Sequence, residues 1–249
     1  NLVYYISKVS EECLDVQKLL KGKEKAIKAI GELFKIYERH LSEENALDFS
    51  TIQSEVLYLL QNNKSILKNL REKITHLMID EYQDTNTIQE RILFLLTGTE
   101  HNICVVGDDD QSLYRFRGAT VRNILEFPKN FPKNKCEIIK LETNYRSHPD
   151  IINFYNKWIN ELDWTKDRVQ LRYNKQIKPQ EKKFERNPSV IKVSSEGDIE
   201  KYFKEVLRFI KTIKKEKVLT DYNQIAFLFR SVKNEKVLAL ANYLEENGI

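Results

Sequence analysis

The chain has 249 residues, of which 41% are hydrophobic and 31% charged, and its formal net charge at pH 7 is +4. This apolar content suffices for a packed core and excludes a wholly disordered chain, and the mild positive charge permits a nucleic-acid partner without requiring one. The seven glycines never lie closer than nine positions apart. The chain therefore contains neither the phosphate-binding pattern G-x-x-x-x-G-K nor the dinucleotide-binding pattern G-x-G-x-x-G.

Three widely spaced cysteines, Cys13, Cys104 and Cys136, offer neither metal-ligand spacing nor a disulfide framework, which favours a reducing compartment. No uncharged apolar run approaches the ~18 residues of a membrane span, and no signal peptide is visible. The chain starts at Asn1 and its single methionine is Met78, so we expect it to be an internal piece of a longer protein.

The N-terminal part is expected to be helical, because apolar residues recur at three- and four-residue steps over residues 11–41 and 50–71. The pattern then changes to short apolar runs that end in polar clusters. These expected strands are residues 74–79, 103–106 and 138–141.

Helices are expected between and after these strands, at about 87–97, at about 119–127 and after a Ser147 cap. Strands that alternate with helices predict a mostly parallel α/β sheet.

Residues 165–189 form a basic segment with eight cationic and three acidic residues. We interpret it as a solvated connector, the usual state of exposed charge, with a phosphate-tracking surface as the alternative. A second α/β unit follows, with expected strands at 190–193 and 225–229 and expected helices at about 198–215 and about 233–246.

The first expected strand ends in Asp80 and Glu81. Ligands of open α/β sheets bind at the carboxyl ends of the strands, where an Asp can hold Mg²⁺ through water and a Glu can activate an attacking water. An acidic pair also occurs as a solvated turn, and a nuclease site that includes Asp84 is a further alternative.

The loop after the second strand contains Tyr114-Arg115-Phe116-Arg117, in which aromatic and cationic residues alternate. Single-stranded DNA is bound by aromatic stacking on bases and by cations along the backbone. Core packing of the two aromatic rings is the alternative interpretation.

Longer strings resemble the motifs of superfamily 1 helicases of the UvrD/Rep/PcrA type, in the same order along the chain. Asp80-Glu81-Tyr82-Gln83-Asp84-Thr85-Asn86 resembles motif II, the Walker B box. Residues 105–119 resemble motif III, residues 141–147 resemble motif IV, residues 225–231 resemble a strand of the second motor domain, and Leu47-Asp48-Phe49 resembles the segment that precedes motif II.

The resemblance implies an α/β fold with a RecA-like parallel sheet of the P-loop NTPase class, a helical N-terminal part and an incomplete second RecA-like unit. The implied domains are a helical part of a 1B-type insertion (1–46), the C-terminal part of motor domain 1A (47–164), the basic linker (165–189) and the beginning of motor domain 2A (190–249).

The resemblance also implies a role for each matching residue. Asp80 would hold Mg²⁺ through water, Glu81 would be the general base, Gln111 would sense the γ-phosphate, Arg146 would be an arginine finger, Tyr145 would stack on adenine, and Tyr114, Phe116 and Arg117 would bind DNA.

The implied function is that of an ATP-dependent DNA helicase or translocase. Its cofactors would be ATP and Mg²⁺, and its partners single-stranded DNA, duplex junctions and repair or restriction proteins, in the cytoplasm and away from membranes. Motif I is expected upstream of Asn1 and the last motifs downstream of Ile249, so the isolated chain is expected to be inactive. The alternative is a non-catalytic module that binds single-stranded nucleic acid or protein.

Overall fold

The computed structural model describes residues 2–98, 102–112, 120–166, 169–180, 189–192 and 197–249. The chain divides into two compact units. The first comprises Asn1–Ser147 and Tyr155–Gln180, and the second comprises His148–Phe154 and Glu181–Ile249. Within the described ranges, no helix is both long enough and apolar enough to cross a membrane.

Five helices form the N-terminal part of the first unit: α1 (Leu2–Glu11), α2 (Val16–Leu20), α3 (Lys25–Glu43), α4 (Phe49–Asn62) and α5 (Lys64–Lys73). The two continuous helical stretches expected from periodicity are therefore wrong in their extent. Asp15 caps α2 by accepting from Gln17 N and Lys18 N, and Asn63 lies between α4 and α5 and accepts from Ile66 N. Short polar side chains of this kind compete with the helical backbone for hydrogen bonds and so divide the helices.

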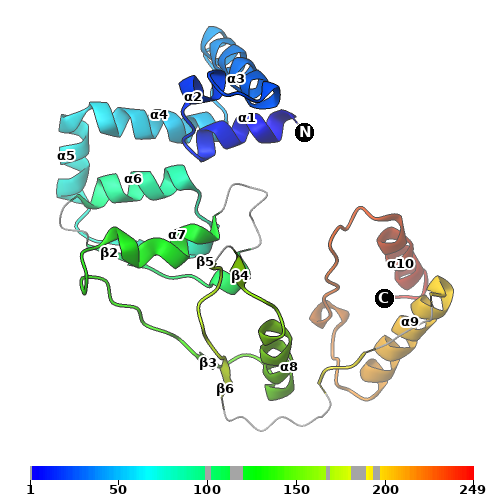
Figure 1. Cartoon of the computed structure of the whole chain (residues 1–249). Helices are drawn as coiled ribbons and strands as arrows, with labels where there is room; N and C mark the ends of the chain where they lie inside the picture. The colour runs from blue at the N-terminus through cyan, green and yellow to red at the C-terminus, as the bar shows by residue number, and fades with distance from the viewer. Residues whose placement is uncertain (1, 99–101, 113–119, 167–168, 181–188, 193–196) are drawn as a thin grey trace. The chain divides into compact units, whose positions relative to one another are not determined.

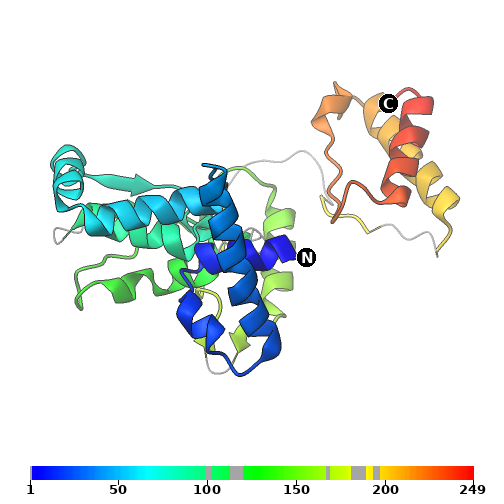
Figure 2. The ribbon, with the colours of Figure 1, turned by 90° about the horizontal axis from the view of Figure 1, so that it is seen from above.

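Strands β1 (Leu77–Ile79) and β2 (Ile103–Val105) pair in parallel, with Met78 opposite Cys104. Helix α6 (Thr87–Thr97) connects them and lies beside α4 (Figures 1 and 2). Asn86 and Gln89 form a capping box at its start, and Gly98 ends it with φ +60°. The expected strand–helix–strand order, and its parallel pairing, is thus confirmed here.

The expected third strand, residues 138–141, is wrong. Strand β3 is instead Thr143–Asn144, and it pairs in parallel with β6 (Lys178–Pro179). Strands β4 (Thr165–Lys166) and β5 (Val169–Gln170) form a separate antiparallel pair. A strand needs a neighbouring backbone to satisfy its N–H and C=O groups, and none of the described residues offers one to 138–141, where Leu141 is 82% exposed.

Three further elements of the middle of the chain are α7 (Val121–Glu126), the 3₁₀ helix η4 (Phe127–Asn130) and α8 (Pro149–Asn160). Ser147 is not the cap of α8, contrary to the expectation. The His148 carbonyl accepts from Ile151 N and Ile152 N, so the helix begins one residue later than expected.

The core of the first unit lies beneath the turn that follows β1. Tyr82 is completely buried in the 3₁₀ helix η1 (Tyr82–Asp84) and packs edge-on against Phe127, with ring centroids 5.2 Å apart. Phe94 and Phe131 surround Phe127. This aromatic cluster anchors the polar turn beside it to the core.

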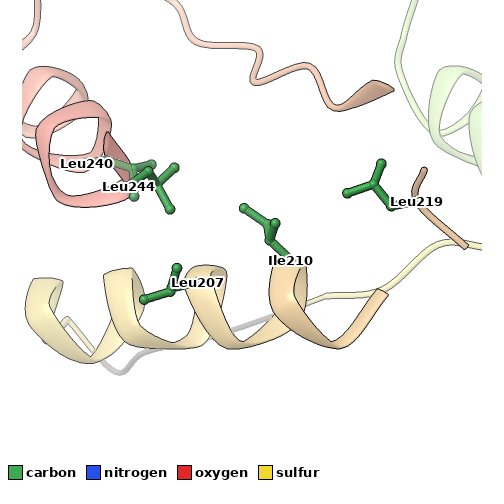
Figure 3. Packing of buried hydrophobic residues seen from close by; sticks show 5 residues of the cluster. All are labelled: Leu207, Ile210, Leu219, Leu240 and Leu244. Carbon is green, nitrogen blue, oxygen red and sulfur yellow. The ribbon is translucent and has the colours of Figure 1, made fainter. Parts of the chain in front are cut away.

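The second unit contains α9 (Ile199–Lys215), the 3₁₀ helix η5 (Tyr222–Gln224) and α10 (Glu235–Glu246). Leu207 and Ile210 of α9 face Leu240 and Leu244 of α10, and Leu219 completes the cluster (Figure 3). The expected strand at 225–229 is wrong, and the described residues 190–192 of the other expected strand are also not in a strand. Leu228 is 93% exposed, and no strand among the described residues pairs with its segment.

We expect Leu244→Ala to destabilise the second unit by about 2–5 kcal/mol, because the truncation leaves a cavity between α9 and α10. Hydrogen exchange of α9 and α10 peptides should accelerate accordingly. Leu238→Ala on the exposed side of α10 is the control and should change exchange little. Equal effects of the two substitutions would contradict this packing.

Candidate active site

The turn after β1 holds Asp80 and Glu81, whose side chains are both exposed. Glu81 has φ 51° and ψ 40°, in the left-handed region that residues other than glycine seldom adopt. This conformation costs on the order of 1–3 kcal/mol. Two hydrogen bonds hold it, since Glu81 N donates to Asp80 Oδ1 at 2.9 Å and Gln83 Nε2 donates to Glu81 Oε2.

Gln83 joins this turn to the loop that follows β2. Its side chain is 1% exposed, and its Oε1 accepts from Asp108 N at 3.0 Å while its Nε2 donates to Glu81. Two backbone hydrogen bonds continue the connection, from Tyr82 N to Val106 O at 2.9 Å and from Val106 N to Ile79 O at 2.8 Å. The ends of the two strands therefore form one hydrogen-bonded structure.

Gly107 is required by this arrangement because a side chain there would displace Gln83. A Cβ at position 107 would lie 2.6 Å from Gln83 Oε1 and 2.9 Å from Ile124 Cδ1. Neither atom can move easily, since Gln83 is buried and Ile124 belongs to the core.

The loop after β2 continues into the 3₁₀ helix η2 (Asp109–Gln111). The side chain of Gln111 is exposed, and its Nε2 donates to Asp108 Oδ2 at 2.9 Å. Gln83 thus links Glu81 to the same short loop that carries Gln111.

Two cations from later in the chain form ion pairs with the three aspartates of this loop. Arg172 forms a two-pronged ion pair with Asp110, from Nε to Oδ1 at 2.7 Å and from a terminal nitrogen to Oδ2 at 3.1 Å. Both side chains are 5% exposed, and the Tyr155 hydroxyl also donates to Asp110. Lys175 Nζ contacts the carboxylates of Asp108, Asp109 and Asp110.

The three aspartates could be mistaken for a metal site, since their carboxylate oxygens lie within 4.8 Å of one another. The Lys175 ammonium already occupies the position between them, so this cluster does not fit a cation. The interpretation of residues 165–189 as a solvated connector is accordingly wrong for Arg172 and Lys175, which are among the least exposed cations described.

The electrostatics of the cluster follow from these pairs. Burial alone would raise the pKa of Asp108 and Asp110, but hydrogen bonds from Lys175 and Gln111 to Asp108, and from Arg172 and Tyr155 to Asp110, lower both values. Burial would likewise lower the pKa of Lys175, and the carboxylates raise it instead. Burial and the Asp110 contact raise the pKa of Tyr155 to about 12.

Asp80 and Glu81 differ from this cluster because no cation neutralises them among the described residues. Asp80 uses one oxygen for Glu81 N, and its other oxygen accepts no hydrogen bond from any described residue. Exposed carboxylate oxygens of this kind are the ligands that Mg²⁺ prefers. The residues present at the end of β1 therefore fit a hydrated Mg²⁺.

Two further expected site residues, Tyr145 and Arg146, follow β3, and both are exposed. Arg146 N donates to Asn144 Oδ1 at 2.9 Å, and the Arg146 guanidinium forms no ion pair within the described ranges. Tyr114, Phe116 and Arg117 lie outside the described residues.

Sequence reasoning missed Gln83, Arg172, Lys175 and Tyr155 as parts of the site. The sequence offers two signals. Gln83 lies inside the string Asp80–Asn86, and the acidic run Asp108–Asp110 has a charge opposite to that of the basic segment 165–189. Neither signal identifies which two of the eight cations of residues 165–189 reach the loop.

The chain is similar to known helicase sequences along almost its whole length. Residues 1–132 match the UvrD/REP helicase N-terminal domain, and residues 139–249 match the UvrD-like helicase C-terminal domain.

Among curated relatives, the ATP-dependent DNA helicase Rep of Buchnera aphidicola subsp. Schizaphis graminum is 42% identical over 148 residues, which are 58% of this chain and 22% of that protein. Rep of Buchnera aphidicola subsp. Acyrthosiphon pisum is 33% identical over 94% of this chain and 34% of that protein. UvrD1 of Mycobacterium tuberculosis (strain ATCC 25618 / H37Rv) is 37% identical over 62% of this chain and 21% of that protein. The chain thus spans about a fifth to a third of the length of these relatives.

We expect Gly107→Ala to lower the free energy of unfolding by about 1–3 kcal/mol, because the methyl group overlaps Gln83 Oε1 and Ile124. Urea denaturation of Gly107→Ala, Gln83→Ala and the double variant measures the effect. The double variant should lose less than the two single losses combined, since removal of Gln83 makes room for the methyl group. Strict additivity would show that the two positions do not share this space.

We also expect the free energy of unfolding to decline as the pH falls below about 4. Asp108 and Asp110 have pKa values below those of the unfolded chain, so their contribution is present above the unfolded value and is lost as they protonate. Lys175→Met should make the decline shallower, and Lys68→Met, at an exposed ion pair of α5, should leave it unchanged. Identical slopes in all three proteins, measured by urea denaturation between pH 3 and 7, would contradict the role of Lys175.

Proposed function

This chain belongs to the UvrD/REP helicase family, and from that premise we propose that the complete protein couples ATP hydrolysis to movement along single-stranded DNA and to unwinding at duplex junctions. The observation that carries the proposal is the exposed Asp80–Glu81 pair at the carboxyl end of β1, tied through Gln83 to the loop after β2. In this proposal its cofactors are ATP and Mg²⁺, and it acts on DNA in the cytoplasm.

The domain assignment is part of this proposal. Residues 1–46 are part of a helical 1B-type insertion, and residues 47–164 are the C-terminal part of the RecA-like motor domain 1A. Residues 165–189 are a basic linker, and residues 190–249 are the beginning of the second RecA-like domain, 2A. The parallel pairing of β1 and β2 supports the assignment for 1A. The family match over residues 139–249 supports that for 2A.

Hydrolysis requires a group that activates the attacking water. Asp80 would hold Mg²⁺ through water, and the bound ion would supply charge neutralisation to the phosphates. Glu81 accepts a proton from the attacking water at its carboxylate, which the hydrogen bond from Gln83 Nε2 holds in place. The left-handed backbone of Glu81 fixes the direction in which that carboxylate leaves the strand.

The remaining assignments concern the phosphates, the base and the DNA. Gln111 leaves Asp108 to contact the γ-phosphate. The planar guanidinium of Arg146 stabilises the negative charge of the transferring phosphoryl group, and Tyr145 stacks on adenine. Tyr114, Phe116 and Arg117 bind single-stranded DNA by stacking and by charge. The short loop that carries Gln111 and Tyr114 supports coupling of hydrolysis to strand movement.

We expect Glu81→Gln in the complete protein to lower the DNA-stimulated ATPase kcat by about 10²–10⁴-fold, because an amide cannot accept the proton. Steady-state ATP hydrolysis with and without single-stranded DNA measures this loss. The matched control is Glu72→Gln on α5, which replaces an exposed carboxylate of a surface ion pair and should leave kcat unchanged.

Two results would overturn the proposal. Glu81→Gln hydrolysing ATP at the wild-type rate would exclude Glu81 as the base. A complete wild-type protein that binds single strands but hydrolyses no ATP would establish the alternative of a non-catalytic binding module.

A further inference from the structure

A continuous set of contacts leads from Gln111 to a lysine 64 positions later in the chain. Gln111 Nε2 donates to Asp108 Oδ2 at 2.9 Å, and Lys175 Nζ donates to Asp108 Oδ1. Asp108 N in turn donates to the Gln83 amide that holds Glu81. Asp108 is therefore shared by Gln111, Lys175 and Gln83.

We propose that Lys175 is a positioning residue for Gln111, acting through Asp108, and that it sets how readily the Gln111 amide is released toward the nucleotide. This inference rests on the proposed ATPase activity and adds to it a residue outside the motifs that the sequence resembles. Within the described residues, the Lys175 ammonium pairs with the three aspartates, and the Arg172 guanidinium donates to the Lys175 carbonyl at 3.4 Å and so holds the segment that carries Lys175.

Two features separate Lys175 from an ordinary buried ion pair. Arg172 and the Tyr155 hydroxyl also bind Asp110, so the loop keeps these contacts when the Lys175 ammonium is lost. The Lys175 ammonium and the Gln111 amide also donate to the same Asp108 carboxylate. Removal of the ammonium therefore leaves Gln111 bound to a carboxylate whose charge Lys175 no longer neutralises. Hydrogen bonds to unshared charged groups are stronger than those to neutralised ones, and Gln111 is then held back.

The test compares Lys175→Met with Lys175→Arg and Lys178→Met in the complete protein. Lys178→Met is the matched control, because Lys178 lies in the same segment but pairs with Glu142 and is 67% exposed. We expect Lys175→Met to lower DNA-stimulated kcat on the order of 10- to 100-fold, with KM for ATP changed less than about twofold. Lys175→Arg should restore most of kcat, and Lys178→Met should behave as wild type.

A double variant distinguishes positioning from a general loss of stability. Asp108→Asn with Lys175→Met should be no slower than Lys175→Met alone, because the two residues act on Gln111 as one unit. A kcat that falls only in proportion to the folded fraction, or a wild-type kcat in Lys175→Met, would overturn the proposal.

A second readout separates failure of this inference from failure of the proposed function. Hydrogen exchange of a peptide spanning residues 103–112 should be faster in Lys175→Met than in wild type or Lys178→Met. Unchanged exchange overturns the positioning role even where ATP is hydrolysed. Absence of ATP hydrolysis by the wild-type protein overturns the proposed function and, with it, the link from Lys175 to the nucleotide, whatever the exchange shows.

Discussion

The buried side-chain amide of Gln83 holds the ends of both strands of the parallel pair, and its orientation is fixed by chemistry. The Glu81 carboxylate only accepts hydrogen bonds and the Asp108 N–H only donates, so the amide nitrogen must face Glu81 and the amide oxygen must face Asp108. One residue thereby sets the position of an exposed carboxylate and of the loop that carries Gln111. The absence of a side chain at Gly107 follows from the same contact, since any Cβ there would overlap the amide oxygen.

The charge of the loop after β2 imposes a second constraint. Three adjacent aspartates with oxygens within 4.8 Å would repel one another if left alone. Lys175 and Arg172 supply two positive charges, and the described cluster keeps a net charge of −1. Because Asp110 and Arg172 are both almost fully buried, removal of either would leave an uncompensated charge in the interior. The loop is thus held by partners more than 60 positions away, which local sequence patterns do not identify.

The sequence predicted local features well and tertiary partners poorly. Strand β1, strand β2 and helix α6 follow from apolar runs, a capping box and Gly98, all of which are short-range signals. The runs at 138–141 and 225–229 are also mainly apolar. A strand forms only beside another backbone, however, and the described residues supply none to either run. The expected helices are interrupted where Asp15 and Asn63 cap α2 and α5. Apolar periodicity does not show that these polar side chains compete for backbone hydrogen bonds. The ionic partners of the loop lie 62–67 positions away along the chain. The sequence therefore indicated their charge but not which residues pair.

The division between exposed and buried groups explains how such a site keeps its geometry. A carboxylate that is to hold a hydrated cation or take a proton from water must remain accessible, because burial would favour its neutral form. Asp80 and Glu81 are accordingly exposed, and solvent alone would not order them. Order comes instead from groups that never meet the ligand: the buried Gln83 amide, the ring of Tyr82 on Phe127, and the strained backbone of Glu81 that these contacts hold. The strain is retained because relaxation of Glu81 would break the hydrogen bond from Gln83, and with it the connection to Asp108 and Gln111.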